Sequence, residues 1–132
     1  MIIEINKKTK LSQLAETFNK YYPFLKIEFF SDVHQRQEPS DSNNVIFKYL
    51  TVEDITTLHH NVFIEIHFWN KTGTVELAFK QKAGLNVQVY RRNGDKWIQT
   101  SGTDELTLEE QNSIGRMHSE DILHGTDRTN KL

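Results

Sequence analysis

Short stretches in which apolar and polar residues alternate are separated along this chain by stretches in which apolar residues recur every three or four positions. Alternation predicts strands in PFLKIEFF (23–30) and at 61–69, because successive strand side chains point to opposite faces. Ile2, Ile3 and Ile5 suggest a first strand before them. In the third strand one face is expected to carry Val62, Ile64, Ile66 and Phe68, and the other Phe63, Glu65, His67 and Trp69.

Spacing of three and four residues predicts two helices between these strands. The first is expected to have Thr9 as its N-cap, to end before Pro23, and to bury a stripe made of Leu11, Leu14, Phe18 and Tyr22. The second is expected to be capped by Thr72 or Thr74, to end at Gly84, and to bury Val75, Ala78 and Phe79.

Two capping boxes predict further helical turns. Thr51 with Asp54 predicts a brief turn after VIFKYL, a short apolar element of uncertain type. Thr107 with Glu110 predicts a short helix, LEEQNSI, that Gly115 ends.

Asn93-Gly94 lies between two alternating segments, LNVQVYRR and DKWIQT, an arrangement typical of a β-hairpin. Asn-Gly tolerates the positive φ that a type I′ turn needs at both central positions. With these two residues as the loop, Tyr90 is expected opposite Trp97. One face then carries Val87, Val89 and Ile98, and the other carries Gln88, Tyr90, Arg92, Asp95, Trp97 and Gln99.

The second face of this hairpin is the candidate binding site, because it combines stacking surface with hydrogen-bonding groups. The residues expected to bind are Gln88, Tyr90, Arg92, Trp97 and Gln99. Phe63 and Trp69 would add to an aromatic patch of the kind enriched at protein interfaces. Alternatively, Tyr90 and Trp97 only brace the hairpin as a cross-strand pair.

The two halves of the sequence share a similar pattern of apolar residues before a strand. Leu14, Phe18 and Leu25 precede KIEFF, as Val75, Phe79 and Leu85 precede NVQVY. We therefore predict an α+β fold with an antiparallel or mixed sheet, short helices packed on one face, and strand-helix-strand units that either arose by duplication or are unrelated. One domain is expected over 1–115, with halves 1–50 and 51–115, a flexible loop at 31–44 and a poorly ordered tail at 116–132.

Composition narrows the class of protein. The net charge of −2 gives no general attraction to nucleic acid, and the absence of cysteine excludes disulfides and thiolate sites. No apolar run approaches the ~20 residues of a membrane span. Because MIIEINKK lacks the features of a signal peptide, a cytoplasmic location is expected.

Enzyme chemistry finds little support in the spacing of residues. The six histidines lack zinc-ligand spacing, with His59, His60 and His67 the least implausible set, and there is no nucleophile elbow or phosphate-binding glycine loop. Adjacent carboxylates such as Glu109 and Glu110 point about 100° apart on a helix. No catalytic residue, metal ligand or cofactor is therefore predicted.

The segment GLNVQVYRRNGDKWIQT, followed by TDELTLEEQN, resembles a recurrent segment of small uncharacterised bacterial proteins. The resemblance covers about residues 72–115, with these matching positions: Gly84, Gln88, Arg91, Gly94, Trp97, Thr100, Thr103, Asp104, Thr107, Leu108, Gln111 and Asn112. It implies a compact α+β module and supplies no activity, ligand or catalytic residue.

Three functions remain open. The first is a non-enzymatic interaction module that binds a protein partner or a second copy of itself through the aromatic sheet face. The second is a nucleic-acid-binding sheet, with Lys80, Lys82, Arg91 and Arg92 on phosphates. The third is a small hydrolase or metal-dependent enzyme built from dispersed histidines and carboxylates. We expect the first.

Overall fold

The structure, a computed structural model, describes residues 1–31, 46 and 49–123. In chain order its elements are β1 (Ile2–Ile5), α1 (Leu11–Tyr21), β2 (Leu25–Phe30), α2 (Val52–Ile55), β3 (Val62–Glu65), α3 (Thr72–Ala83), β4 (Asn86–Asn93), β5 (Lys96–Gln99), the 3-10 turn η2 (Ser101–Thr103) and α4 (Leu108–Leu123). The predicted loop at 31–44 lies, except for Ser31, outside the described residues.

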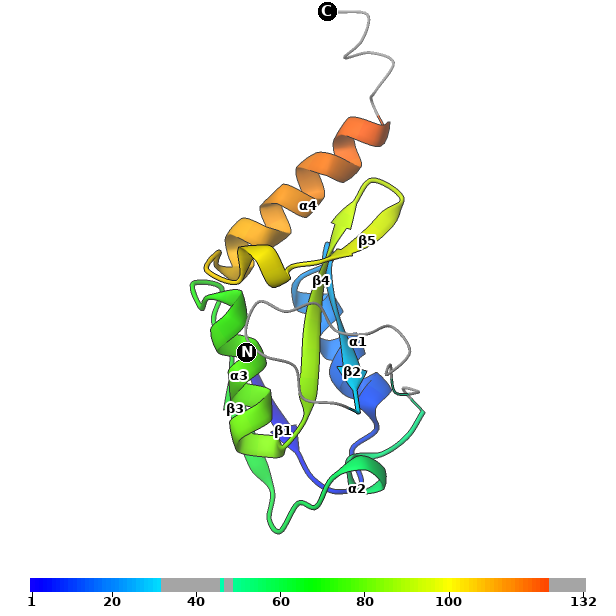
Figure 1. The fold of residues 1–132 in the computed structure, drawn as a ribbon, viewed down its shortest axis with the longest axis vertical. Helices are drawn as coiled ribbons and strands as arrows, with labels where there is room; N and C mark the ends of the chain where they lie inside the picture. The colour runs from blue at the N-terminus through cyan, green and yellow to red at the C-terminus, as the bar shows by residue number, and fades with distance from the viewer. Residues whose placement is uncertain (32–45, 47–48, 124–132) are drawn as a thin grey trace, which may run out of the picture.

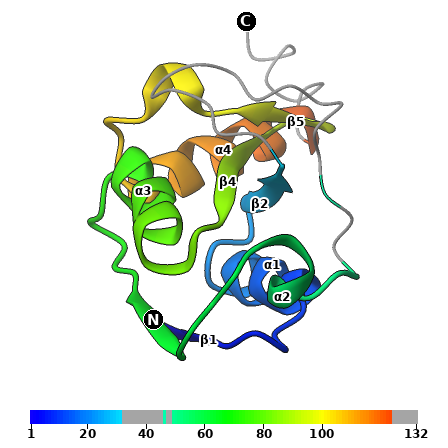
Figure 2. The same cartoon turned by 60° about the horizontal axis from the view of Figure 1, so that its bottom comes forward.

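Two separate antiparallel sheets form the fold, β1-β3 and β2-β4-β5 (Figures 1 and 2). Their inner faces share one core with α1 and α3, and the predicted stripes on these two helices are largely buried. The α+β class is therefore confirmed. The largest side chains that are fully buried in this core include Phe18, Phe29 and Phe79.

The two halves of the chain repeat the same hydrogen bonds around the start of each long helix. The backbone N–H of Asn6 donates to Thr9 Oγ1 at 3.0 Å, and the N–H of His67 donates to Asn70 Oδ1 at 2.7 Å. These contacts fix the turn between strand and helix in each half, which explains why Thr9 serves the turn while Lys10 becomes the N-cap.

The capping boxes also occupy equivalent places in the two halves. The bridge between Lys10 and Thr51 matches that between Lys71 and Thr107. Each threonine opens a helix whose third residue, Asp54 or Glu110, accepts the threonine backbone N–H. This hydrogen bond is the largest cause of a lowered pKa at each carboxylate.

Strand pairing follows the same internal symmetry. Ile3 lies opposite Ile64, its equivalent in the second half, and Glu28 lies opposite Gln88. A two-fold axis between the halves requires such self-pairing of equivalent positions. The halves are thus arranged as a pseudo-dimer within one chain, so a residue in one half can be compared directly with its equivalent in the other.

Three further expectations about local structure are wrong. The N-cap of α3 is Lys71 and not Thr72 or Thr74. Phe68, expected on the same strand face as the buried Ile64 and Ile66, is 52% exposed because the chain leaves β3 and turns at residues 67–70. The last helix does not end at Gly115 but continues to Leu123. Gly115 lies instead where the helix closely approaches Phe24, the residue before β2: a Cβ there would lie 2.9 Å from Phe24 Cβ.

Candidate interaction site around Trp97

The β4–β5 hairpin places Trp97 on the outer side of the three-stranded sheet. Asn93 pairs with Lys96, so the loop is Gly94-Asp95 and not Asn93-Gly94. Gly94, at φ 67°, supplies the positive φ of the turn. The predicted register is therefore wrong.

The shifted register changes the partners but preserves the predicted face. Trp97 lies opposite Arg92, and Tyr90 lies opposite Gln99, whose Nε2 donates to the Tyr90 hydroxyl at 3.2 Å. Because the register moved by two positions, Tyr90, Arg92, Trp97 and Gln99 still share one face.

Lys26 joins this face from β2, where it lies opposite Tyr90. Its Nζ is 5.1 Å from the centre of the Trp97 ring and 5.3 Å from that of Tyr90, and the Arg92 Cζ is 5.3 Å from the Trp97 ring. These are cation-π distances. Glu28 Oε1, 3.1 Å from Lys26 Nζ, holds the lysine in place. Sequence analysis missed Lys26, because the pairing of β2 with β4 is not encoded locally.

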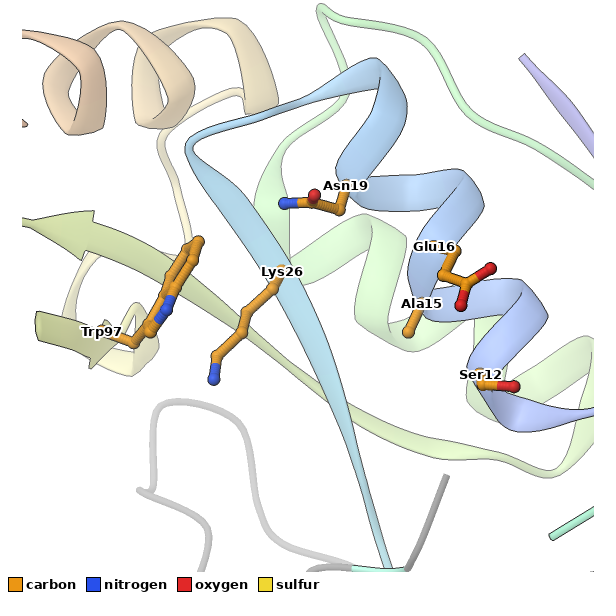
Figure 3. A pocket seen from close by; sticks show the side chains of 6 residues that line it. All are labelled: Ser12, Ala15, Glu16, Asn19, Lys26 and Trp97. Atoms are coloured by element: carbon orange, nitrogen blue, oxygen red, sulfur yellow. The ribbon is translucent and has the colours of Figure 1, made fainter. Parts of the chain in front are cut away.

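Two shallow hollows lie beside Trp97. One, of about 350 Å³, lies between α1 and the sheet and is lined by Ser12, Ala15, Glu16, Asn19, Lys26 and Trp97 (Figure 3). The other, of about 460 Å³, is lined by Pro23, Phe24, Arg92, Gly94, Asp95, Trp97 and Ser119. Trp97 is therefore a partly exposed ridge between them.

The predicted binding residues do not all reach this surface. Gln88 is fully buried, and its Nε2 donates to Val89 O. Arg92 is partly exposed, and its Nε donates to Gly94 O, which fixes the guanidinium beside Trp97. The surface thus comprises Tyr90, Arg92, Trp97 and Gln99 with the addition of Lys26.

Phe63 and Trp69 do not extend it, because Phe63 lies on β3, in the other sheet, and Trp69 lies in the turn between β3 and α3. Arg91 also belongs elsewhere. It alternates to the opposite face of β4 from Arg92 and donates through Nη1 to Gln111 Oε1 at 2.7 Å. The two arginines of the cationic set proposed for phosphate contacts therefore lie on opposite faces of the sheet, and Lys80 and Lys82 lie on α3.

Several positions of the segment 72–115 have structural roles. Gln111 Nε2 donates to both Thr103 O and Thr103 Oγ1 at 2.9 Å, and Asn112 Oδ1 accepts the Phe24 N–H at 2.9 Å. Gly84 ends α3 at φ 68°, as predicted. Gln111 and Asn112 therefore hold α4 in place, and Gly84 ends α3.

One ionisable group was missed by sequence analysis. Burial raises the pKa of the Glu76 carboxyl to about 8, and the nearby Asp104 raises it further against the opposing effect of the Val89 N–H. An acid within an amphipathic helix gives no local signal of such burial. Glu76 lies where the pairing of β4 with β5 ends, because its carboxyl accepts the backbone N–H of Val89, which has no partner in β5.

Histidines and carboxylates do not converge on a metal site in the part of the chain that the structure describes. Among residues 1–31, 46 and 49–123, no three His, Asp or Glu side chains form a group that could hold a metal ion. His67 lies instead 3.1 Å from Glu65 and stacks on Trp69.

Over the same described ranges, no helix has the length and apolar character needed to cross a membrane. Comparison of the sequence and fold with family models, curated proteins and solved structures gave no match.

Proposed function

We propose that this protein is a non-enzymatic interaction module that associates with a second copy of itself through the Trp97 surface. The observation that carries the proposal is the Trp97 ridge with a hollow on either side. In a two-fold arrangement the same patch meets itself, so a ridge beside a hollow is self-complementary. Trp and Arg are also the residue types most enriched at the energetic centre of interfaces.

The charges on the Trp97 surface support a second copy of the chain as the partner. The hollow beside α1 contains Lys26 and Glu16, and the other contains Arg92 and Asp95. Each hollow thus offers both signs of charge, and a second copy could place its acids against the cations of the first. A nucleic acid would instead favour an uninterrupted cationic surface.

Light scattering after gel filtration tests the proposal, over loading concentrations from about 10 μM to about 1 mM. The wild-type mass should rise with concentration toward that of a dimer. Trp97→Ser should remain a monomer, because a central aromatic anchor contributes about 2 kcal/mol or more to an interface. Trp69→Ser is the matched control, since it removes an exposed tryptophan from the turn after β3 and should associate as the wild type does.

Circular dichroism shows whether each variant is folded. If Trp97→Ser unfolds, Glu16→Lys tests the same surface, because Glu16 is exposed and its reversal disturbs the charge balance of one hollow. A wild type that stays monomeric throughout, or folded Trp97→Ser and Glu16→Lys variants that both associate normally, would contradict the proposal.

A further inference from the structure

The turn after β3 exposes two large aromatic side chains. Phe68 is 52% exposed and Trp69 57% exposed, and their rings meet edge to face at 4.9 Å. His67 stacks on Trp69 at 4.2 Å and contacts Glu65. Glu65 lies opposite Ile2, another exposed apolar residue. These five residues form a connected surface, which we call the aromatic turn.

The internal symmetry shows that the fold does not require aromatic residues in this turn. Lys7 and Lys8 occupy the equivalent positions in the first half. There the Lys7 carbonyl accepts the N–H of Glu53 at 3.0 Å, as the Phe68 carbonyl accepts the N–H of Glu109 at 3.0 Å. The same backbone contacts form when two lysines occupy these positions, so folding does not require Phe68 and Trp69. Their exposure therefore indicates another role.

Comparison of the two halves also identifies a carboxylate, Glu109, whose equivalent in the first half has an ion-pair partner. In the first half Lys8 Nζ is 2.9 Å from Glu53 Oε1. In the second half Trp69 replaces that lysine, and the exposed Glu109 has no ion-pair partner among the described residues. The nearby Lys71 does not substitute, because it is 2.8 Å from Glu105.

We propose that the aromatic turn is a docking site for a basic, apolar segment of another protein. An apolar side chain of the segment packs on Phe68 and Trp69, and a lysine or arginine takes the place relative to Glu109 that Lys8 takes relative to Glu53. Cations also bind favourably over an indole face. Glu4 and Glu65, on the outer face of the β1-β3 sheet, add negative charge, so a second copy meeting this surface two-fold would bring like charges together.

A defined probe tests this site on the intact protein. The probe is a fluorescein-labelled eight-residue peptide of alternating Lys and Leu, and its control has Glu in place of Lys. We expect fluorescence anisotropy to detect binding of the Lys peptide that weakens with salt, and little binding of the Glu peptide.

Four variants locate the binding. Phe68→Ser/Trp69→Ser should weaken it about tenfold by removing the apolar contact without adding charge. Phe68→Lys/Trp69→Lys should abolish it and leave thermal stability near that of the wild type, as Lys7 and Lys8 indicate. Glu109→Gln should weaken binding several-fold. Glu53→Gln is the matched control and should not, because Lys8 already neutralises Glu53.

Three results would overturn the proposal. They are equal binding of the Glu peptide, unchanged binding by folded Phe68→Ser/Trp69→Ser, and equal losses from Glu53→Gln and Glu109→Gln. The last would show general attraction to an acidic surface. None of these results bears on the Trp97 surface, so this site and self-association can fail separately.

Discussion

The Glu76 carboxyl accepts the backbone N–H of Val89 at 2.8 Å, in the place that a carbonyl of a longer β5 would occupy. Thr100 donates to the Val89 carbonyl through its backbone N–H and its hydroxyl, so both polar groups of Val89 are satisfied. The Glu76 side chain thus completes the hydrogen bonding where the pairing of β4 with β5 ends, and its ionisation depends on its burial.

Stability should therefore fall as pH rises from about 4.5 to about 8. The folded-state pKa of Glu76 is about 8, above the ordinary value of 4.5. In this window the folded chain holds a proton that the unfolded chain has released, so the free energy of unfolding decreases with pH. Glu76→Gln keeps an acceptor for the Val89 N–H. It should reduce the fall in the free energy of unfolding across this pH range by about 1–2 kcal/mol, because water still reaches part of the Glu76 site. Urea unfolding at pH 5 and pH 8.5 measures it; parallel wild-type and variant profiles would count against the raised pKa.

Gly94 should tolerate a side chain poorly. Its φ of 67° lies in the left-handed region, where a β-branched residue is strained. Gly94→Val should lower the free energy of unfolding by about 1–3 kcal/mol. Gly102→Val is the comparison, because the φ of Gly102 is not positive and no atom lies within 4 Å of an added Cβ there. Equal thermal stability of Gly94→Val and wild type would mean that the turn differs from the one described.

Gly115→Ala should destabilise the protein even though alanine favours helix. Within α4 the change gains about 1 kcal/mol of helix propensity. However, the new Cβ would lie 2.9 Å from Phe24 Cβ and 3.0 Å from Phe24 O, so α4 must move away from Phe24. We expect a net loss of about 1–2 kcal/mol. Gly102→Ala, where no atom lies within 4 Å, should be close to neutral. A stabilised Gly115→Ala variant would show that this contact is not close.

The equivalent turns should respond alike to loss of their side-chain acceptors. Thr9→Ala and Asn70→Ala each remove the acceptor of a backbone N–H, that of Asn6 and of His67 respectively. Each should cost about 1 kcal/mol in denaturant unfolding. A loss in only one half would indicate that the symmetry of the backbone does not extend to the energetics.

Local signals predicted much of this fold. The capping boxes at Thr51 and Thr107, the cap at Gly84 and the stripe through Leu14 and Phe18 depend on residues within a few positions of one another, and all are present. The errors occurred where side chains or distant segments decide the structure. The Asn70 side chain turns the chain and exposes Phe68, and the approach of Phe24 gives Gly115 its place inside a helix.

The candidate site was predicted less completely than the fold. Alternation along β4 and β5 correctly placed Tyr90, Arg92 and Trp97 on one face. It could not predict that Lys26 would lie over Trp97, or that Gln88 would be buried, because both depend on packing between distant segments. The significance of Trp69 became visible only when the equivalent Lys8 could be compared with it in space.

The most direct test of self-association through Trp97 follows the two tryptophan indole N–H signals in a nitrogen-proton correlation spectrum. The variants Trp69→Phe and Trp97→Phe assign the signals. The same spectrum tests whether self-association is independent of the aromatic turn. The chain has two tryptophans, one at each proposed surface. Dilution of the wild type should shift the Trp97 signal and leave that of Trp69 in place, whereas the Lys-Leu peptide, added at the lowest concentration, should shift Trp69 and not Trp97. A Trp97 signal that does not change on dilution, in a protein whose mass is also constant, would contradict self-association through this surface.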